Sequence, residues 1–230
     1  SEELRCEMEA LRLYDGKGIV RLIDADTEQG AMLLERLRPG TPLSLVEDDV
    51  EATHVAAQVM RQLWRPLPDE HSFPTVARWA LGLGRLRAEF DGGTGPFPRA
   101  LVERAESLFI DLLASSGEPV LLHGDLHYDN IVAGMREPWL ALDPKGLVGE
   151  PEYEVGALMR NRLPSPLQGA EATWLLSARL SQLAEELNFS CERLHAWSFA
   201  QAVLSAWWSY EDHGHGWEKA VACAEALAVV

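Results

Sequence analysis

The chain has 230 residues, of which 47% are hydrophobic, so it is long and apolar enough to bury a core. Asp and Glu total 36 against 20 Lys and Arg, and the net charge of −16 would repel nucleic acid while suiting a cationic small molecule. The three cysteines are scattered, which favours a reducing, cytoplasmic location. No apolar run approaches the ~20 residues of a membrane span. We therefore expect neither nucleic acid nor a membrane as a partner.

Apolar residues at helical spacing predict a first helix that runs from the N-terminus to about Tyr14, where the glycines of YDGKG end it. Residues 19–26 and 30–37 are strand-like, and the short polar gap between them predicts an antiparallel hairpin. The segment RPGTPL has two prolines and a glycine. We place a domain boundary there, between residues 1–38 and 39–230.

Helices are also predicted at residues 47–64, 73–90 and 98–114, and three more between about 170 and 230. The acids near Asp48 suit a helix start because the helix dipole favours negative charge there, and Pro98 suits a first helical position. The Pro-rich residues 162–170 are expected to form a surface loop near the substrate. Taken together, the pattern predicts a hairpin-bearing N-terminal part and a mostly helical remainder.

The most informative segment is PVLLHGDLHYDNIVAG, residues 119–134, because polar residues interrupt an apolar run. It is followed by a second strand-like run, WLALD. Asp and Asn often bond the backbone of their own turn, which is the simplest interpretation of any one of these side chains. Five such groups within eight residues exceed what a turn requires. They are His123, Asp125, His127, Asp129 and Asn130.

A dinuclear metallophosphatase is a second interpretation of GDLH, since His and Asp suit divalent metals. It needs further His and Asp ligands at other strand ends, and the remaining histidines do not stand in such settings. Phosphoryl transfer fits better, because it needs a carboxylate at the accepting hydroxyl and groups that hold Mg²⁺ against the nucleotide phosphates. In protein kinases, an Asn follows the catalytic Asp by five residues, and a second metal-binding Asp follows later. Asn130 follows Asp125 at this spacing, and WLALD ends at Asp143.

The motif HGDLHYDN, followed by LALDPKGLVGEPEYEVGALMRN, resembles the aminoglycoside phosphotransferase family of kinase-like enzymes. Within it, the resemblance is to the branch of streptomycin 6-phosphotransferases and hydroxyurea kinases, whose second motif begins Asp-Pro-Lys and continues to a Gly-Glu/Asp-Pro segment. It covers most of the chain and is strongest over residues 120–161. It implies a protein-kinase-like α+β fold. It also implies antibiotic-resistance-type transfer of phosphate from ATP, with Mg²⁺, to a hydroxyl of a small molecule such as streptomycin.

The resemblance implies roles for residues of the motif. Asp125 would be the catalytic base, Asn130 and Asp143 the Mg²⁺ ligands, and His123 a scaffold residue that orders the loop. His127 stays unassigned. An acidic cleft would concentrate a guanidinium-bearing substrate. Candidate acids for that cleft are Asp129, Glu150, Glu152 and Glu154.

The resemblance also implies a nucleotide site. The backbone of Glu35 and Leu37, in the hinge LLERLRPG, would pair with adenine, and Glu7 would partner the phosphate-binding lysine. Residues 1–38 would then belong to an N-terminal nucleotide-binding lobe and residues 39–230 to the helical C-terminal lobe. Lys145 would either neutralise a phosphate or pair with a neighbouring acid.

Two parts of the kinase template are not found in the sequence. Its glycines do not form Gly-x-Gly-x-x-Gly, and none of its lysines, Lys17, Lys145 and Lys219, precedes the first helix. We expect either a piece of a longer protein, which a start on a helix favours, or a protein that has lost its ATP clamp. The alternatives to an aminoglycoside kinase are thus a pseudokinase or small-molecule binding protein, and a kinase of a different metabolite.

Overall fold

The computed structural model describes residues 2–164 and 170–230, so most of the loop expected at residues 162–170 lies outside the described residues. The chain forms two compact units. The first unit comprises residues 1–74 and 118–154, and the second comprises residues 75–117 and 155–230. The boundary expected near residue 38 does not coincide with the limits of these units. The expected boundary separates the two lobes of a kinase, and that division stays a prediction.

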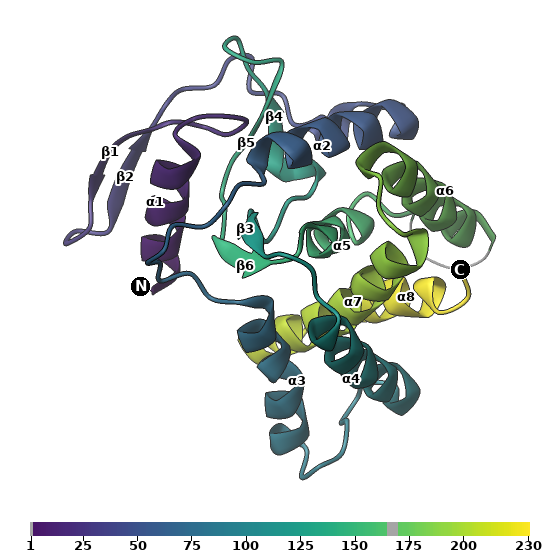
Figure 1. Ribbon diagram of the computed structural model, residues 1–230. Coiled ribbons are helices and arrows are strands. Elements are labelled where there is room, and N and C mark those ends of the chain that lie inside the picture. The colour runs from purple at the N-terminus through teal and green to yellow at the C-terminus, as the bar shows by residue number, and fades with distance from the viewer. Residues whose placement is uncertain (1, 165–169) are drawn as a thin grey trace. The chain divides into compact units, whose positions relative to one another are not determined.

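The N-terminal part of the first unit is the predicted helix and hairpin. Helix α1 (Glu2–Tyr14) is amphipathic and buries Met8, Leu11 and Tyr14. It lies beside the antiparallel pair β1 (Leu22–Asp26) and β2 (Ala31–Leu34) (Figure 1). The carboxylate of Asp26 accepts hydrogen bonds from the NH groups of Glu28 and Gln29, which shapes the turn between the two strands.

Two further strand pairs of the first unit carry the polar motif. Strand β3 (Val120–Leu122) pairs with β6 (Leu147–Gly149), and β4 (Ile131–Ala133) pairs with β5 (Trp139–Ala141), both antiparallel. The strand-like runs expected at 119–122 and 139–143 are thus strands, but they do not pair with each other. Their partners β4 and β6, like β3 and β5, are each three residues long.

Helix α2 (Asp49–Leu63) and short 3₁₀ turns complete the described part of the first unit. Helix α2 packs against β5, and the Asp48 carboxylate caps it by accepting hydrogen bonds from two NH groups. The described residues also include three 3₁₀ turns. They are η1 (Leu43–Leu45), η2 (Tyr128–Asn130) and η3 (Pro151–Glu154). The last two lie at the polar motif and its C-terminal continuation.

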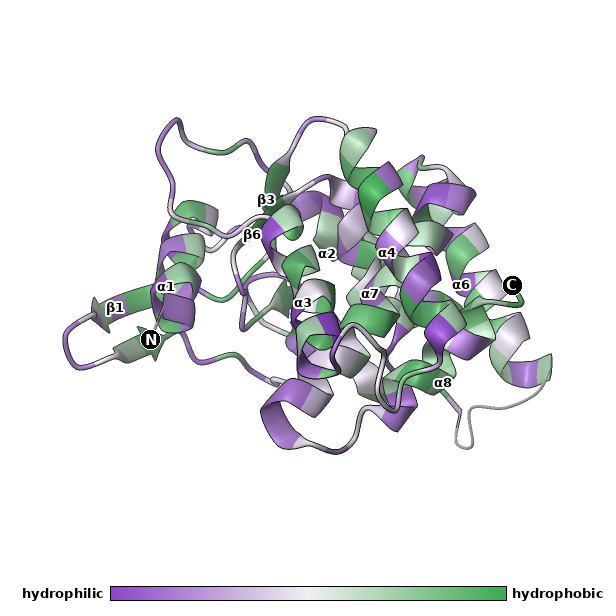
Figure 2. Cartoon of the chain, turned by 90° about the horizontal axis from the view of Figure 1, so that it is seen from below, coloured by the Kyte–Doolittle hydropathy of each residue, from purple (hydrophilic) through white to green (hydrophobic). Residues whose placement is uncertain are grey.

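The second unit is helical. Its central helix is α7 (Cys191–His213), which packs against each of α3 (Val76–Glu89), α4 (Arg99–Ala114), α5 (Val155–Met159), α6 (Ala170–Leu187) and α8 (Glu218–Leu227). Figure 2 shows hydrophobic and hydrophilic residues side by side along α3 and α4, as amphipathic helices require. Pro98 precedes α4 as its cap rather than opening it. Among the described residues, no helix is both long and apolar enough to cross a membrane.

Candidate active site

The loop between β3 and β4 carries the predicted base and one predicted metal ligand. The loop turns sharply at Gly124, whose φ of +88° favours glycine because a side chain would be strained there. Asn130 closes it, since its side-chain amide donates a hydrogen bond to the Asp125 carbonyl at 3.0 Å and its NH donates to the His127 carbonyl at 2.9 Å. The five-residue spacing therefore places Asp125 and Asn130 at the two ends of one hydrogen-bonded turn.

The segment after β5 runs alongside this loop and brings Asp143 to it. The NH of Leu142 donates to the Asn130 carbonyl at 2.9 Å, and the NH of Lys145 donates to the His123 carbonyl at 2.7 Å. Asp143 itself has a φ of +61°, a left-handed conformation that Asp tolerates better than most residues. These backbone bonds bring the predicted second metal ligand next to the first.

His123 ties the two segments together. It is fully buried, with Nε2 2.9 Å from the Leu142 carbonyl oxygen, while Nδ1 accepts a hydrogen bond from the Asp125 NH at 3.2 Å. These partners require a neutral ring with its proton on Nε2. Burial lowers the pKa of His123 to about 4, in agreement with that neutral state. The geometry supports the scaffold role expected for this residue.

Glu154 occupies a position that the sequence did not predict. Its two carboxylate oxygens accept hydrogen bonds from the NH groups of His123, at 2.7 Å, and Gly124, at 2.9 Å. Glu154 and Glu150 are only 1% and 2% exposed, so the expectation that they face a substrate is not met for these two acids. The sequence shows three alternating acids, and only the folded chain reveals which of them are buried. Glu152 is half-buried and stays a candidate.

The Asp125 side chain is 33% exposed and faces an imidazole. Nε2 of His127 lies 3.7 Å from its Oδ2, and the NH of Asp129 donates to Nδ1 of the same ring at 3.3 Å. Because Nδ1 accepts, a neutral His127 carries its proton on the nitrogen that faces Asp125. Asp129 is 55% exposed and is accessible to a ligand.

The side chains around Asp143 could hold a divalent cation. An Asp carboxylate and an Asn amide oxygen are the hard ligands that Mg²⁺ prefers, and Asp143 is 44% exposed. Its oxygens lie 3.0 and 3.2 Å from Nζ of Lys145, so Lys145 pairs with this acid, and a role at a phosphate stays a prediction. Burial raises the pKa of Glu7, and the charge of Asp143 raises it further, so this acid of α1 interacts electrostatically with Asp143. The described residues contain no group of three or more His, Cys, Asp or Glu side chains placed to hold a metal alone.

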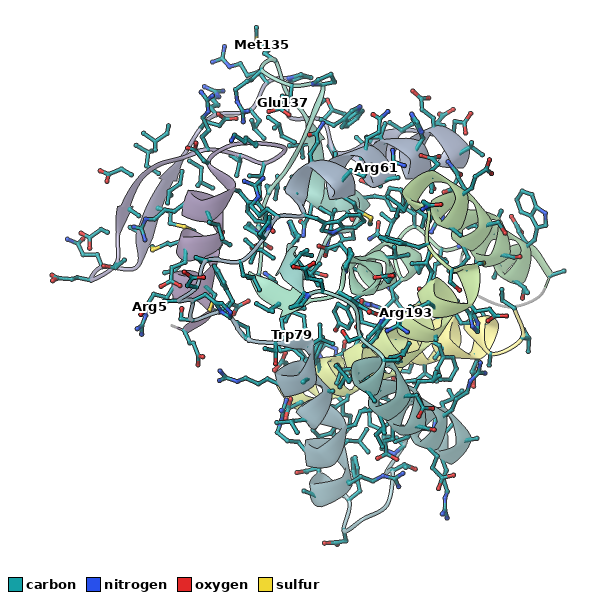
Figure 3. All side chains as sticks on the ribbon, in the orientation of Figure 1. Arg5, Arg61, Trp79, Met135, Glu137 and Arg193 are labelled. Atoms are coloured by element: carbon teal, nitrogen blue, oxygen red, sulfur yellow. The ribbon has the colours of Figure 1, made fainter. Side chains whose placement is uncertain are left out.

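The predicted adenine-binding segment follows β2. The NH of Glu35 donates to the Arg21 carbonyl at 2.9 Å, so a nucleotide could use only the carbonyl of this residue. Arg136, which the sequence reading missed, donates to the Glu35 carboxylate at 2.9 Å and to the carbonyls of Gly16 and Ile19. It stands in the turn between β4 and β5, beside Met135 and Glu137 (Figure 3). Arg136 also donates to the adjacent Glu137 carboxylate, but no local pattern marks its role, because Gly16, Ile19 and Glu35 are more than 100 residues away.

A sequence model described as aminoglycoside/hydroxyurea antibiotic resistance kinase matches residues 1–213. Streptomycin 6-kinase of Streptomyces griseus is 33% identical over 236 residues, covering 99% of this chain and 74% of the relative. Hydroxyurea phosphotransferase of Kitasatospora aureofaciens is 37% identical over 238 residues, covering 98% of this chain and 65% of the relative.

Solved structures show the same fold. A thermostable mutant of aminoglycoside phosphotransferase APH(4)-Ia, crystallised as a ternary complex with ADP and hygromycin B, superposes with a TM-score of 0.67. It is 14% identical in sequence, and the match covers 99% of this chain and 81% of that one. The kinase-like α+β fold predicted from the sequence is confirmed.

Proposed function

Because the chain belongs to the aminoglycoside/hydroxyurea antibiotic resistance kinase family, we propose that it transfers the γ-phosphate of ATP to a hydroxyl of a cationic small molecule, with Asp125 as the base. The observation that carries this proposal is the hydrogen-bonded turn that joins Asp125 to Asn130, with the Asp143 segment bonded alongside it. Phosphoryl transfer uses a carboxylate base and metal ligands of these types, and it is the reaction of the kinases in this family.

Asp125 acts on the acceptor. Its partly exposed carboxylate receives the proton of the attacking hydroxyl, and the neighbouring NH of His127 stabilises the negative charge of that carboxylate. The remaining rate enhancement comes from positioning, which the buried bonds of His123 provide.

Asn130 and Asp143 would hold Mg²⁺. When bound, the ion neutralises the charge of the nucleotide phosphates. Nζ of Lys145 lies 3.0 Å from the Asp143 carboxylate. We therefore expect Lys145 to leave this carboxylate when Mg-ATP binds and to turn toward the phosphates. Glu35 and Leu37 would bind adenine through their backbone, with Arg136 holding that segment in place.

Streptomycin is the first acceptor to test, because the streptomycin 6-kinase of S. griseus matches nearly the whole chain and streptomycin carries guanidinium groups. Of the four predicted acids, Asp129 is exposed and Glu152 half-buried, so these two could face such a cation, whereas Glu150 and Glu154 are buried. The net charge of −16 favours the approach of a cation over long range.

Incubation with Mg-ATP and streptomycin, hydroxyurea or a panel of amino sugars, followed by mass spectrometry of the acceptor, tests the proposal. We expect one phosphate on a guanidinium- or amine-bearing acceptor, and loss of product in Asp125→Ala. Asp212→Ala, a change of an exposed acid near the end of α7, is the matched control and should leave the yield unchanged. If wild-type protein in which nucleotide binding is verified phosphorylates none of these acceptors, the assigned substrate class is wrong.

A further inference from the structure

The buried carboxylate of Glu154 contacts the start of the catalytic loop from outside the motif. We propose that Glu154 is a positioning residue: by binding the NH groups of His123 and Gly124, it fixes the direction in which Asp125 presents its carboxylate to the acceptor. This inference rests on the proposed function only in that Asp125 is taken as the base. Glu154 itself touches neither acceptor nor nucleotide.

The hydrogen-bond geometry favours this role over that of a general structural acid. The two carboxylate oxygens are divided between consecutive NH groups, at 2.7 and 2.9 Å, and the side chain is 1% exposed. Hydrogen bonds to an ionised carboxylate are shorter and stronger than neutral ones. The left-handed φ of Gly124, +88°, is the conformation in which the loop makes both bonds.

The contact is relayed to Asp125 through the backbone. Gly124 immediately precedes Asp125, and the NH of Asp125 is itself bonded to His123, the other residue that Glu154 holds. On its far side His123 is fixed to the Leu142 carbonyl. Glu154 therefore holds the two residues before the base, while His123 and Asn130 hold the base itself.

An ionised carboxylate satisfies both NH groups, because each of its two oxygens accepts one hydrogen bond. Glutamine of the same length has one oxygen acceptor, and its NH₂ group would face an NH donor, so one of the two loop NH groups loses its partner. Aspartate keeps the charge and both oxygens but is one methylene shorter. We therefore expect Glu154→Asp to retain more function than Glu154→Gln, although glutamine matches the wild-type volume more closely.

Two measurements on the same variants test the role. The first is steady-state kinetics with Mg-ATP and streptomycin, in which Glu154→Gln should lower kcat roughly 10- to 100-fold and change both KM values less than about threefold. The second is amide hydrogen exchange over residues 120–127, which should become roughly tenfold faster. The matched control is Glu106→Gln, which removes a carboxylate that also accepts two short hydrogen bonds, from Arg87, but in the other unit.

The outcomes separate the possibilities. Unchanged kcat in a folded Glu154→Gln protein, or slower turnover of the same size in Glu106→Gln, overturns the positioning role. Equal exchange of residues 120–127 in wild type and Glu154→Gln also overturns it. If the wild type phosphorylates no acceptor, the proposed function fails, but the exchange measurement still decides whether Glu154 holds the loop. If Glu154→Gln does not fold, Glu154→Asp should still lower kcat and speed exchange over residues 120–127, to a smaller extent, and no change in either overturns the role.

Discussion

The buried carboxyl group of Glu154 should make the free energy of unfolding depend on pH. Burial raises the pKa of Glu154 from 4.5 to about 7, and the hydrogen bonds from Gly124 and His123 offset part of that increase. In the unfolded chain the group returns to its ordinary value. A carboxyl whose pKa is raised by folding stabilises the native state fully below the unfolded pKa, and this stability is lost as the pH rises through the folded pKa. Glu154→Gln removes the titration.

The magnitude follows from the shift. At about 1.4 kcal/mol per pKa unit, the full effect is about 3 kcal/mol, and about 2 kcal/mol of it falls between about pH 5.5 and about pH 8. Of the groups that face Glu154, His123 stays neutral in this range because its pKa is about 4. Tyr14 also stays neutral, because burial raises its pKa well above 10. Asp125 is the remaining charged neighbour, and it is present in both proteins.

Urea unfolding of wild type and Glu154→Gln at several pH values measures the effect. We expect the wild type to lose about 2 kcal/mol relative to the variant as the pH rises from about 5.5 to about 8, whatever constant difference the altered hydrogen bonds introduce. A difference that stays constant within about 0.5 kcal/mol over that range, or one that changes in the opposite direction, would refute the account of this carboxyl.

Three further substitutions test the positioning of the loop and hinge. His123→Ala leaves the Leu142 carbonyl without its imidazole donor and should lower the free energy of unfolding by about 1–3 kcal/mol for each lost partner. If urea denaturation gives the wild-type free energy of unfolding, the buried hydrogen-bond network does not stabilise the fold. Gly124→Ala forces a side chain into a φ of +88° and should cost about 1–2 kcal/mol and slow turnover; wild-type turnover would contradict the need for this backbone conformation. Arg136→Met removes the ion pair with Glu35 and should raise the KM for ATP roughly three- to tenfold at nearly constant kcat, whereas an unchanged KM would separate this arginine from the nucleotide site.

Local patterns predicted much of the fold. The first helix, the hairpin, and the helices at 47–64, 73–90 and 98–114 all form within a few residues of their expected limits, because apolar spacing and turn residues act over short stretches. Strands β4 and β6 were missed, although they are as long as β3 and β5, because their short apolar runs directly adjoin the polar residues of the motif. The pairing of the strands was not predicted either, because β3 pairs with β6, which lies about 25 residues later in the chain.

The candidate site divides in the same way. Asp125 and Asn130 belong to one turn, so their spacing in the sequence was enough to predict that they lie close together. Asp143 was identified from its position after a strand and from the family motif. Glu154 was taken for a substrate acid and Arg136 was not noticed, because their roles come from partners about 30 and 100 residues away. A hydrogen bond between such distant segments leaves no periodic mark in the sequence.

The most direct test of the central claim is transfer of phosphate from Mg-ATP to streptomycin by Asp125→Asn, measured together with nucleotide binding by calorimetry. Asparagine keeps the size of the side chain but cannot accept the hydroxyl proton. The account predicts a loss of turnover of roughly 10²- to 10⁴-fold, with nucleotide affinity within about threefold of wild type. Turnover equal to that of the wild type, in a variant that binds nucleotide normally, would contradict the assignment of Asp125 as the base.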